Sequence, residues 1–432
     1  MSNFQSFVIG IFIFFIVLAV LIFTGVFSGG TVGKGAEEIV LWGTIPSEKM
    51  ISPVEKINAQ NRKKFAIVYE EKDPETYERE LVESLAAGTG PDLFFLAEDS
   101  IVKDAGKVAK IPYTSVSERT FKDTFVEEGE LYMDEDGIIA LPVFVDPLVL
   151  YWNRDIFSSE GIAAPPKTWS EVAALAPVLT KSDTAANISR SAVALGEFSN
   201  IPHAKDILAA MMLQAGNGIV EKRSGELVSV LARNEGKSRG ASSLRFYTQF
   251  ADPRTNAYSW NRSLPDAKSA FIAGDAAMYF GYASELSEIA GGNPHLNFDI
   301  APFPFVDEGP RITRGKMEAI AVARTAARPA AFSAAYAAAW GDFARDVAKS
   351  IGLPPARRDL LSSADEGGAY EAVFRAAAVA ARGWLDPDPA ETERIFRDMI
   401  EGVTSGRFRP TDALSAADVQ MKRIINNNLF LP

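Results

Sequence analysis

The sequence predicts an α/β protein of two domains that follow an N-terminal transmembrane helix. The chain has 432 residues, which is more than one hydrophobic core usually organises. Short apolar runs typical of strands alternate with segments of helical periodicity. Residues 7–27 contain no charged side chain, and a helix of about 30 Å would cross the hydrocarbon core of a bilayer.

The apolar segment at residues 7–27 is interpreted as an uncleaved anchor. A cleaved signal peptide would have a basic start and a shorter apolar core, but residues 1–6 contain neither Lys nor Arg. Lys34 is the one flanking charge, so the charges do not set the orientation of the helix. Residues 28–35 are rich in glycine and are expected to be a flexible tether, which completes an N-terminal unit at residues 1–35.

The composition excludes several classes of function. A net charge of -12 argues against binding to a nucleic-acid backbone, which requires a basic face. The absence of cysteine excludes disulfides, thiolate nucleophiles and cysteine zinc sites. With His203 and His295 as the only imidazoles, a histidine metal site is not expected. The sequence has no phosphate-binding loop, dinucleotide-binding glycine motif, GxSxG or HExxH, and no cofactor or metal is predicted.

The first predicted strand covers residues 39–42 and is followed by a helix at 47–61 and a strand at 65–69. Trp42 and Thr44 lie at the end of the first strand, where open α/β sheets bind their ligands. Both are therefore candidates for ligand contacts. Core packing of Trp42 is the alternative.

A helix begins at Asp73–Pro74 and ends at Gly88, and the apolar strand LFFLA follows. Glu98 and Asp99 come directly after this strand. Two adjacent carboxylates can hold sugar hydroxyls, bind calcium or act as an acid and base pair. They can also simply cap a helix.

Residues 137–171 specify several local structures in succession. Pro142 and Pro147 cannot donate hydrogen bonds to a ladder, so this strand is expected at an edge or in a crossing between domains. Asn153 is the predicted cap of the next helix. Thr168 and Glu171 then have the spacing of a capping box.

The second half continues the alternation. Residues 298–305 predict a strand that returns to the first domain, and Arg314 and Glu318 beyond it are weak candidates for the site, with a solvated loop as the alternative. The aromatic stripe in the helix that Pro329 opens is interpreted as core. Trp384 precedes a helix capped by Asp388, and the last helix covers residues 411–428.

The order "ALP", Asp146, "LYWNRDIF", Gly161, "PPKTWSEV" resembles the hinge-crossing signature of bacterial extracellular solute-binding proteins of the sugar-binding type, the class that includes maltodextrin-binding proteins. The family usually has Tyr-Asn where this chain has Trp152-Asn153. "GTGPDLFFLAED" and the order "YSWN", "F..GDAAM", "GY" are also similar to the family. The resemblance implies a two-lobed, periplasmic-binding-protein-like (type II) fold that closes over a solute.

In this family the region around "YSWN" supplies aromatic residues to the cleft, which suggests Trp260, Asn261 and Tyr282. Aromatic faces stack on sugar rings, while amides and carboxylates bind the hydroxyls. The full set of predicted ligand-binding residues is Trp42, Thr44, Glu98, Asp99, Asp146, Trp260, Asn261, Tyr282 and Trp384.

The resemblance implies a membrane-anchored, extracytoplasmic binding protein that delivers a carbohydrate to the permease of an ABC importer, without enzymatic activity. Lobe one would comprise residues 38–148 and 298–346, and lobe two residues 149–297 and 347–432. An anchored glycoside hydrolase that uses a pair of carboxylates from Glu98, Asp99 and Asp146 is one alternative. A solute-sensing receptor subunit is the other.

Overall fold

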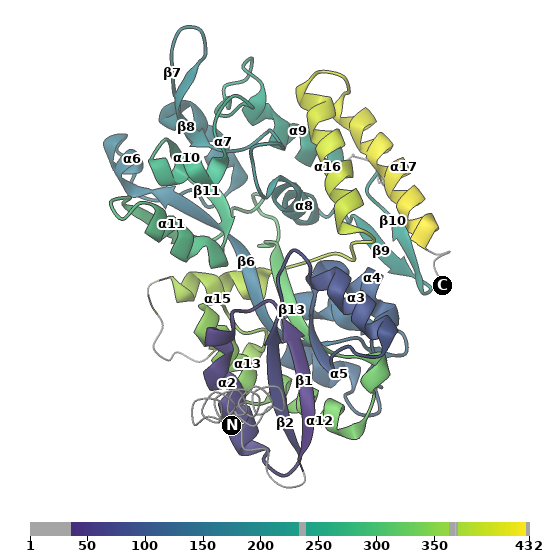
Figure 1. Ribbon diagram of the computed structural model, residues 1–432. Coiled ribbons are helices and arrows are strands. Elements are labelled where there is room, and N and C mark those ends of the chain that lie inside the picture. Colours follow the sequence, from purple (N-terminus) through teal and green to yellow (C-terminus); the bar gives the residue numbers. More distant parts are fainter. Residues whose placement is uncertain (1–35, 233–238, 363–367, 369, 429–432) are drawn as a thin grey trace, which may run out of the picture.

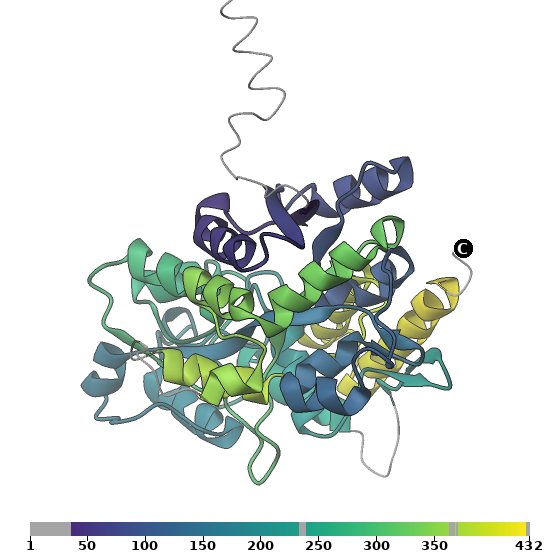
Figure 2. The same cartoon turned by 90° about the horizontal axis from the view of Figure 1, so that it is seen from below.

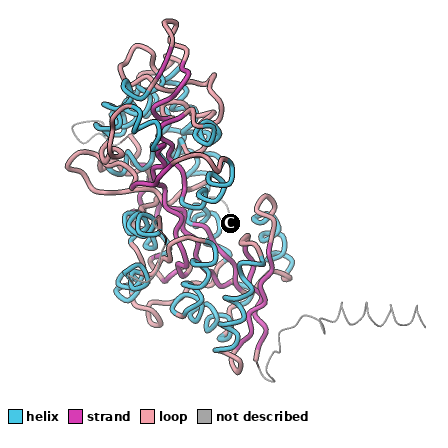
Figure 3. The backbone as a smooth tube through the Cα atoms, turned by 90° about the vertical axis from the view of Figure 1, so that its left-hand side faces the viewer, coloured by secondary structure: helices cyan, strands magenta, loops and turns pink. Residues whose placement is uncertain are grey.

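The computed structural model describes residues 36–232, 239–362, 368 and 370–428, which form two lobes along one long sheet (Figure 1). Nine strands within these residues form the sheet, in the order β2-β1-β3-β13-β6-β11-β8-β7 with β12 paired to β6. Figure 3 shows the strands running through the length of the molecule, with helices around them. The α/β class and the two-lobed architecture predicted from the sequence are confirmed.

One strand, β6 (Leu141–Asn153), belongs to both lobes. Its first half pairs with β13 (Gly315–Val322), and its second half pairs with β11 (Ala276–Tyr282) and β12 (Phe298–Ala301), all antiparallel. The predicted crossing is therefore confirmed, but β6 lies in the middle of the sheet and not at its edge. The register with β13 shifts beside Pro142, where the ladder is irregular because proline has no N–H to donate.

Lobe one contains the sheet order β2-β1-β3-β13, with β1 parallel to both neighbours and β13 antiparallel to β3. Its elements are β1 (Glu37–Gly43), α2 (Ser47–Gln60), β2 (Phe65–Glu71), α3 (Tyr77–Ala87), β3 (Leu93–Ala97), α4 (Ile101–Asp104), α5 (Glu118–Thr124), β4 (Met133–Asp134), β5 (Gly137–Ile138), α12 (Pro329–Trp340), α13 (Asp342–Ile351) and α14 (Arg358–Ser362).

Lobe two is built around β11, which is antiparallel to β6 and parallel to β8. Its elements are α6 (Arg154–Ser159), α7 (Trp169–Leu179), β7 (Lys181–Ser182), β8 (Ile188–Val193), α8 (Ala204–Gln214), β9 (Val220–Arg223), β10 (Glu226–Ser229), α9 (Arg239–Thr248), α10 (Ala267–Ala273), α11 (Leu286–Gly292), α16 (Pro389–Thr404) and α17 (Pro410–Asn428).

Each lobe has its own hydrophobic core. Helix α15 (Glu371–Ala380) contacts both, because Ala377 packs in the core of lobe two and Ala378 in that of lobe one. The core of lobe two also includes Ile300 and Ala301 of β12, so the strand that returns to lobe one is β13 and not residues 298–305 as expected. The lobe boundaries given by the sequence stay predictions.

The capping signals of Asn153, Thr168 and Asp388 are confirmed, whereas the helix predicted to begin at Asp73–Pro74 begins at Tyr77, after a turn, with no side-chain cap. The side chain of Asn153 accepts hydrogen bonds from the N–H groups of Asp155 at 3.0 Å and Ile156 at 3.1 Å. Thr168 and Glu171 form the predicted capping box. These helices begin where the sequence places them because the signal and its hydrogen-bond partners lie within one turn.

The aromatic stripe of residues 329–347, which was predicted to be core, is only partly buried. The chain breaks at Gly341 into α12 and α13, and the buried face of α12 is made of alanines. Phe332, Tyr336 and Trp340 are half-buried and pack at the margin of the core. The small side chains allow the helix to approach the sheet closely.

The predicted membrane helix at residues 7–27 and its tether lie outside the described residues. Among the residues that the structure does describe, no helix has the length and apolar character needed to cross a bilayer.

Candidate functional site

A buried ionic cluster lies where the two lobes meet. Arg314 directly precedes β13 and is 5% exposed. Its guanidinium lies 2.8 Å from Glu98 and 3.5 Å from Glu128, both in lobe one, and 3.4 Å from Asp206 of α8 in lobe two. One cation therefore faces carboxylates from both lobes, which makes Arg314 an ionic link between them.

The carboxylates around Arg314 have very different proton affinities. Burial raises the pKa of Glu98 well above its usual range, and it raises the pKa of Glu128 to about 7 despite the charge of Arg314. Burial also acts on Asp206, but the charges of Arg314, Lys316 and Lys205 outweigh it and lower the pKa to about 2. Asp206 is thus the firmly ionised partner of Arg314 near neutral pH.

Tyr282 and Asp146 lie beside this cluster. Tyr282 ends β11, is 1% exposed, and has the Lys316 ammonium 4.3 Å from its ring centroid. Asp146 on β6 accepts a hydrogen bond from the N–H of Ser284 at 3.0 Å, and burial raises its pKa to about 6. Of the predicted site residues, Glu98, Asp146 and Tyr282 are the ones that the structure brings close to Arg314 and Lys316.

A further group of polar side chains lines the lobe-two side. Lys205 of α8 donates hydrogen bonds to Asp386 at 2.7 Å and to Thr392 at 2.7 Å. Its ammonium also lies 5.5 Å from the ring centroid of Trp384, which is buried and stacks on Phe396. The predicted residue Trp384 therefore lies next to Lys205, which directly precedes Asp206 in the sequence, but the indole of Trp384 is buried.

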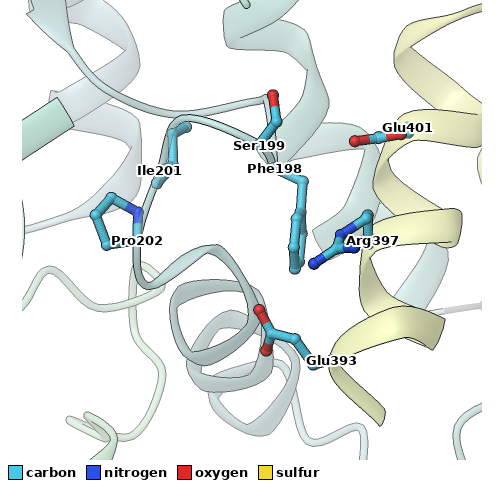
Figure 4. Close-up of a pocket in the computed structure, with 7 residues that line it drawn as sticks. All are labelled: Phe198, Ser199, Ile201, Pro202, Glu393, Arg397 and Glu401. Atoms are coloured by element: carbon cyan, nitrogen blue, oxygen red, sulfur yellow. The ribbon is translucent and has the colours of Figure 1, made fainter. Parts of the chain in front are cut away.

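A pocket of about 490 Å³ adjoins this group on the surface of lobe two (Figure 4). The loop at residues 198–202 forms one wall, and α16 forms the other with Glu393, Arg397 and Glu401. Figure 4 shows Phe198 between the loop and Arg397, whose guanidinium carbon lies 5.1 Å from the ring centroid.

Glu393 lines the pocket and is affected by charges of the interlobe region. Burial raises its pKa, and the nearby charges of Lys205 and Asp206 also act on it. The residues that line the pocket all belong to lobe two. The pocket combines the ring of Phe198, which is 6% exposed and has Arg397 over it, with carboxylates and a guanidinium that can bind the hydroxyls of a polyhydroxylated solute.

The lobe-one side presents the ends of β1 and β3. Trp42 is 7% exposed, and the ammonium of Lys72 lies 3.7 Å from its ring centroid. Thr44 follows β1 and is half-buried. Asp99 lies near Glu318 of β13, whose pKa is raised to about 8 by burial and by the charge of Asp99.

Neither Glu98 nor Asp99 caps the short helices that follow them. Instead, Glu98 accepts hydrogen bonds from Arg314 and from the N–H of Met317 at 3.2 Å. Within the described ranges, no group of three or more His, Cys, Asp or Glu side chains is placed to hold a metal ion.

Trp260 and Asn261 lie elsewhere in lobe two. Trp260 is 1% exposed, and its indole N–H donates to Asn200 at 3.1 Å. The amide of Asn261 donates to the hydroxyl of Tyr258 at 2.7 Å. No contact joins either of them to Arg314 in the described part of the chain, and their role as ligand contacts stays a prediction.

The sequence patterns did not predict the burial of Arg314 or the presence of the pocket. Arg314 is buried in an ionic cluster and does not lie in a solvated loop, which was the favoured interpretation. Phe198 and Arg397 are about 200 residues apart in the chain, so no local pattern connects them. The one usable signal was the repetition of Glu393, Arg397 and Glu401 on one face of an amphipathic helix.

The comparisons with known proteins agree with this geometry. Residues 53–375, about three quarters of the chain, match the family described as bacterial extracellular solute-binding protein. A curated relative, a probable ABC transporter-binding protein of Deinococcus radiodurans, is 40% identical over 50 residues. That match covers 12% of this chain and only 12% of the relative's length.

Solved structures share the fold over most of their length. The cyclic alpha-maltosyl-1,6-maltose binding protein from Arthrobacter globiformis is 16% identical with a TM-score of 0.75, over 91% of this chain and 100% of that one. A cyclo/maltodextrin-binding protein complexed with maltotetraose is 15% identical with a TM-score of 0.72, over 90% of this chain and 97% of that one. The maltodextrin-binding domain of Bdellovibrio bacteriovorus, bound to maltotriose, is 15% identical with a TM-score of 0.64, over 90% and 100%.

At these identities the solved structures establish the two-lobed fold, and the match over residues 53–375 establishes the family. The chain belongs to the bacterial extracellular solute-binding proteins.

Proposed function

We propose that this protein captures an oligosaccharide between its lobes and delivers it to the permease of an ABC importer. The observation that supports this most directly is the ionic cluster of Arg314, Glu98 and Asp206 between the lobes, together with the lobe-two pocket of Phe198 and Arg397. A solute that extends from this pocket to the cluster would contact both lobes. Binding and closure can then be coupled, because the solute favours the state in which both lobes contact it.

The family and the ligands of the structural neighbours support a carbohydrate as the solute. The pocket combines one aromatic face with several hydrogen-bonding groups, which is the chemistry that sugar rings require. We also propose that residues 7–27 anchor the protein and hold the body outside the cytoplasm, close to its permease.

The carboxylates that a glycoside hydrolase would need are held by the protein itself. Glu98 bonds to Arg314 and Met317, and Asp146 bonds to Ser284. The match to a family of binding proteins is what supports binding without cleavage. A receptor that passes closure to a signalling partner would bind its solute in the same way.

Isothermal titration of the full chain against a panel of mono- and oligosaccharides tests the proposal, with each sugar recovered afterwards. We expect saturable binding with a Kd of about 1 μM, which corresponds to roughly -8 kcal/mol, and an intact sugar. Cleaved sugar would move the assignment to a hydrolase. No binding across the panel would contradict a carbohydrate ligand.

Variants then locate the site. We expect Phe198→Ala and Arg397→Ala each to weaken the affinity about tenfold, because each removes contact worth about 1.4 kcal/mol. Arg394→Ala is the matched control, since Arg394 lies on the same helix and bonds to exposed partners outside the pocket. Equal losses in all three variants would place the sugar elsewhere.

A further inference from the structure

A second cavity lies behind the segment that carries Arg314. It has a volume of about 370 Å³ and is enclosed by residues 164–167, residues 301–305, residues 311–313 and the last turns of α15. Figures 1 and 2 place α15 on one side of the molecule and α16 with α17 on the other. The cavity shares no lining residue with the Phe198 pocket, which lies against α16.

The cavity is apolar because of the side chains that line it. Pro165, Pro166, Phe303, Phe305 and Ile312 form much of the wall, and α15 presents only alanines. Methyl groups are too short to fill the space between the helix and the crossing segment. An apolar occupant would be stabilised in proportion to the apolar surface that it buries.

The backbone of the wall has few hydrogen-bonding groups to offer. The N–H of Thr313 donates to Ala380 at 3.1 Å, and the N–H of Phe305 donates to Lys167 at 3.1 Å. The carbonyls of Pro304 and Ile312 accept hydrogen bonds from the amide of Gln214, at 2.8 Å and 2.5 Å. A sugar or another highly polar molecule would lose its hydration here without replacement partners.

The rim of the cavity carries positive charge. Lys167 and Arg311 line it and are exposed, and none of the lining residues is Asp or Glu. The guanidinium of Arg311 lies 5.0 Å from the ring centroid of Phe305. Within the described residues neither cation forms an ion pair. Two acidic side chains of neighbouring segments bond to other groups than the rim ammonium and guanidinium: Glu171 accepts from the backbone N–H of Lys167 at 2.5 Å, and Asp307 accepts from the hydroxyl of Ser170.

We propose that this cavity is a binding site for a small amphiphilic carboxylate with a medium-chain aliphatic or aromatic body. The body fills the apolar space, and the carboxylate reaches Lys167 and Arg311 at the rim. In a chain of net charge -12, two unpaired cations beside an apolar cavity favour an anion over a neutral or cationic amphiphile.

The location gives such a ligand influence over the lobes. The wall segment 311–313 continues directly into Arg314, and α15 packs into both cores. Occupation of the cavity would therefore bias the relative position of the lobes and change the affinity for the solute. This consequence rests on the proposed function, whereas binding of the carboxylate does not.

Calorimetric titration of the full chain with octanoate, octanol and octylamine tests the site in the absence of sugar. We expect saturable binding of octanoate to one site, at least tenfold tighter than that of octanol or octylamine. The double variant Lys167→Gln/Arg311→Gln should weaken octanoate binding at least tenfold. Arg119→Gln, which changes an exposed arginine of lobe one, should leave it unchanged.

Ala380→Leu places a larger side chain in the cavity and provides a second test of the location. We expect this variant to lose octanoate binding and still to show a cooperative thermal unfolding transition, which would demonstrate that it is folded. Equal binding of octanol would overturn the anion assignment, and unchanged binding in both variants would overturn the location. No saturable octanoate binding, with sugar binding intact, would overturn the proposal and leave the proposed function standing.

Discussion

Residues 311–314, which lead into β13, separate two regions of very different chemistry. On one side, Arg314 faces the carboxylates of Glu98, Glu128 and Asp206. On the other, the preceding residues Ile312 and Thr313 line an apolar cavity with α15. The comparison shows that one strand connection can separate a polar site from an apolar one, because each side takes its character from different neighbours.

The two sides also affect stability in opposite ways. Buried charges carry a large desolvation penalty, which only good pairing offsets. An unfilled apolar cavity loses dispersion contacts but leaves no charge unpaired. Substitutions should therefore have large effects on the charged side and small effects on the apolar side, and the following predictions test this contrast from the largest expected effect to the smallest.

Arg314→Gln should have the largest effect. It leaves Glu98, Glu128 and Asp206 close together without their shared cation, so we expect the free energy of unfolding to fall by about 3–5 kcal/mol at pH 8. Chemical denaturation measures this loss. Arg311→Gln, three residues earlier, is the matched control and should change stability by less than about 0.5 kcal/mol. Equal losses in the two variants would remove the distinction between the sides.

Glu128→Gln should stabilise the protein at high pH. Its pKa in the folded protein is about 7 and its ordinary value is 4.5, so the folded state holds more protons between these values and ionisation destabilises it above them. We expect a gain of roughly 1–3 kcal/mol at pH 8. The gain should shrink as the pH falls through 7 and should vanish below about 4.5. Glu75→Gln, at an exposed site, is the control, and a gain that does not depend on pH would contradict the explanation.

Ala380→Leu should stabilise the protein modestly by filling the apolar cavity. We expect the free energy of unfolding to rise by about 0.5–1 kcal/mol, measured by denaturation in the absence of any carboxylate. Ala372→Leu, on an exposed position of α15, adds the same side chain outside the cavity and should give no comparable gain. A loss of stability in Ala380→Leu would mean that the space is closed or filled in solution.

Lys222→Ala should have the smallest effect. Lys222 of β9 forms an ion pair with Asp134 of β4, which joins the lobes at their rim. An ion pair near the surface contributes about 0.2–1 kcal/mol, and this one would stabilise the closed state that holds the solute. We therefore expect the solute to dissociate up to about fivefold faster from the variant in a stopped-flow experiment. Lys56→Ala breaks an ion pair within lobe one and should leave the dissociation rate unchanged.

Much of the fold could be predicted because its signals are local. The capping groups of Asn153, Thr168 and Glu171 act within one turn, and each was confirmed by its hydrogen bonds. Pro142 and Pro147 correctly indicated the crossing, but their preference for edge strands did not hold in the middle of the sheet. The irregular ladder beside Pro142 accommodates the missing donor.

The site was less predictable because it is assembled over long distances in the sequence. The position of Arg314 depends on carboxylates from three other segments, and the pocket joins the loop of Phe198 to α16. The family resemblance suggested Trp260 as a sugar contact, yet Trp260 is enclosed in the core of lobe two. Burial decides between these roles, and a sequence pattern does not show burial at single positions.

The most direct test of the account is whether a sugar changes the distance between the lobes. The chain contains no cysteine, so spin labels can be placed at Glu83→Cys on α3 and Arg423→Cys on α17, both exposed positions. We predict that a saturating oligosaccharide shortens the mean distance between the labels and narrows its distribution, as measured by pulsed electron paramagnetic resonance. A label pair within lobe one, Glu55→Cys and Glu83→Cys, should not change. An unchanged interlobe distance, with the sugar demonstrably bound, would contradict the coupling of the pocket to the cluster at Arg314.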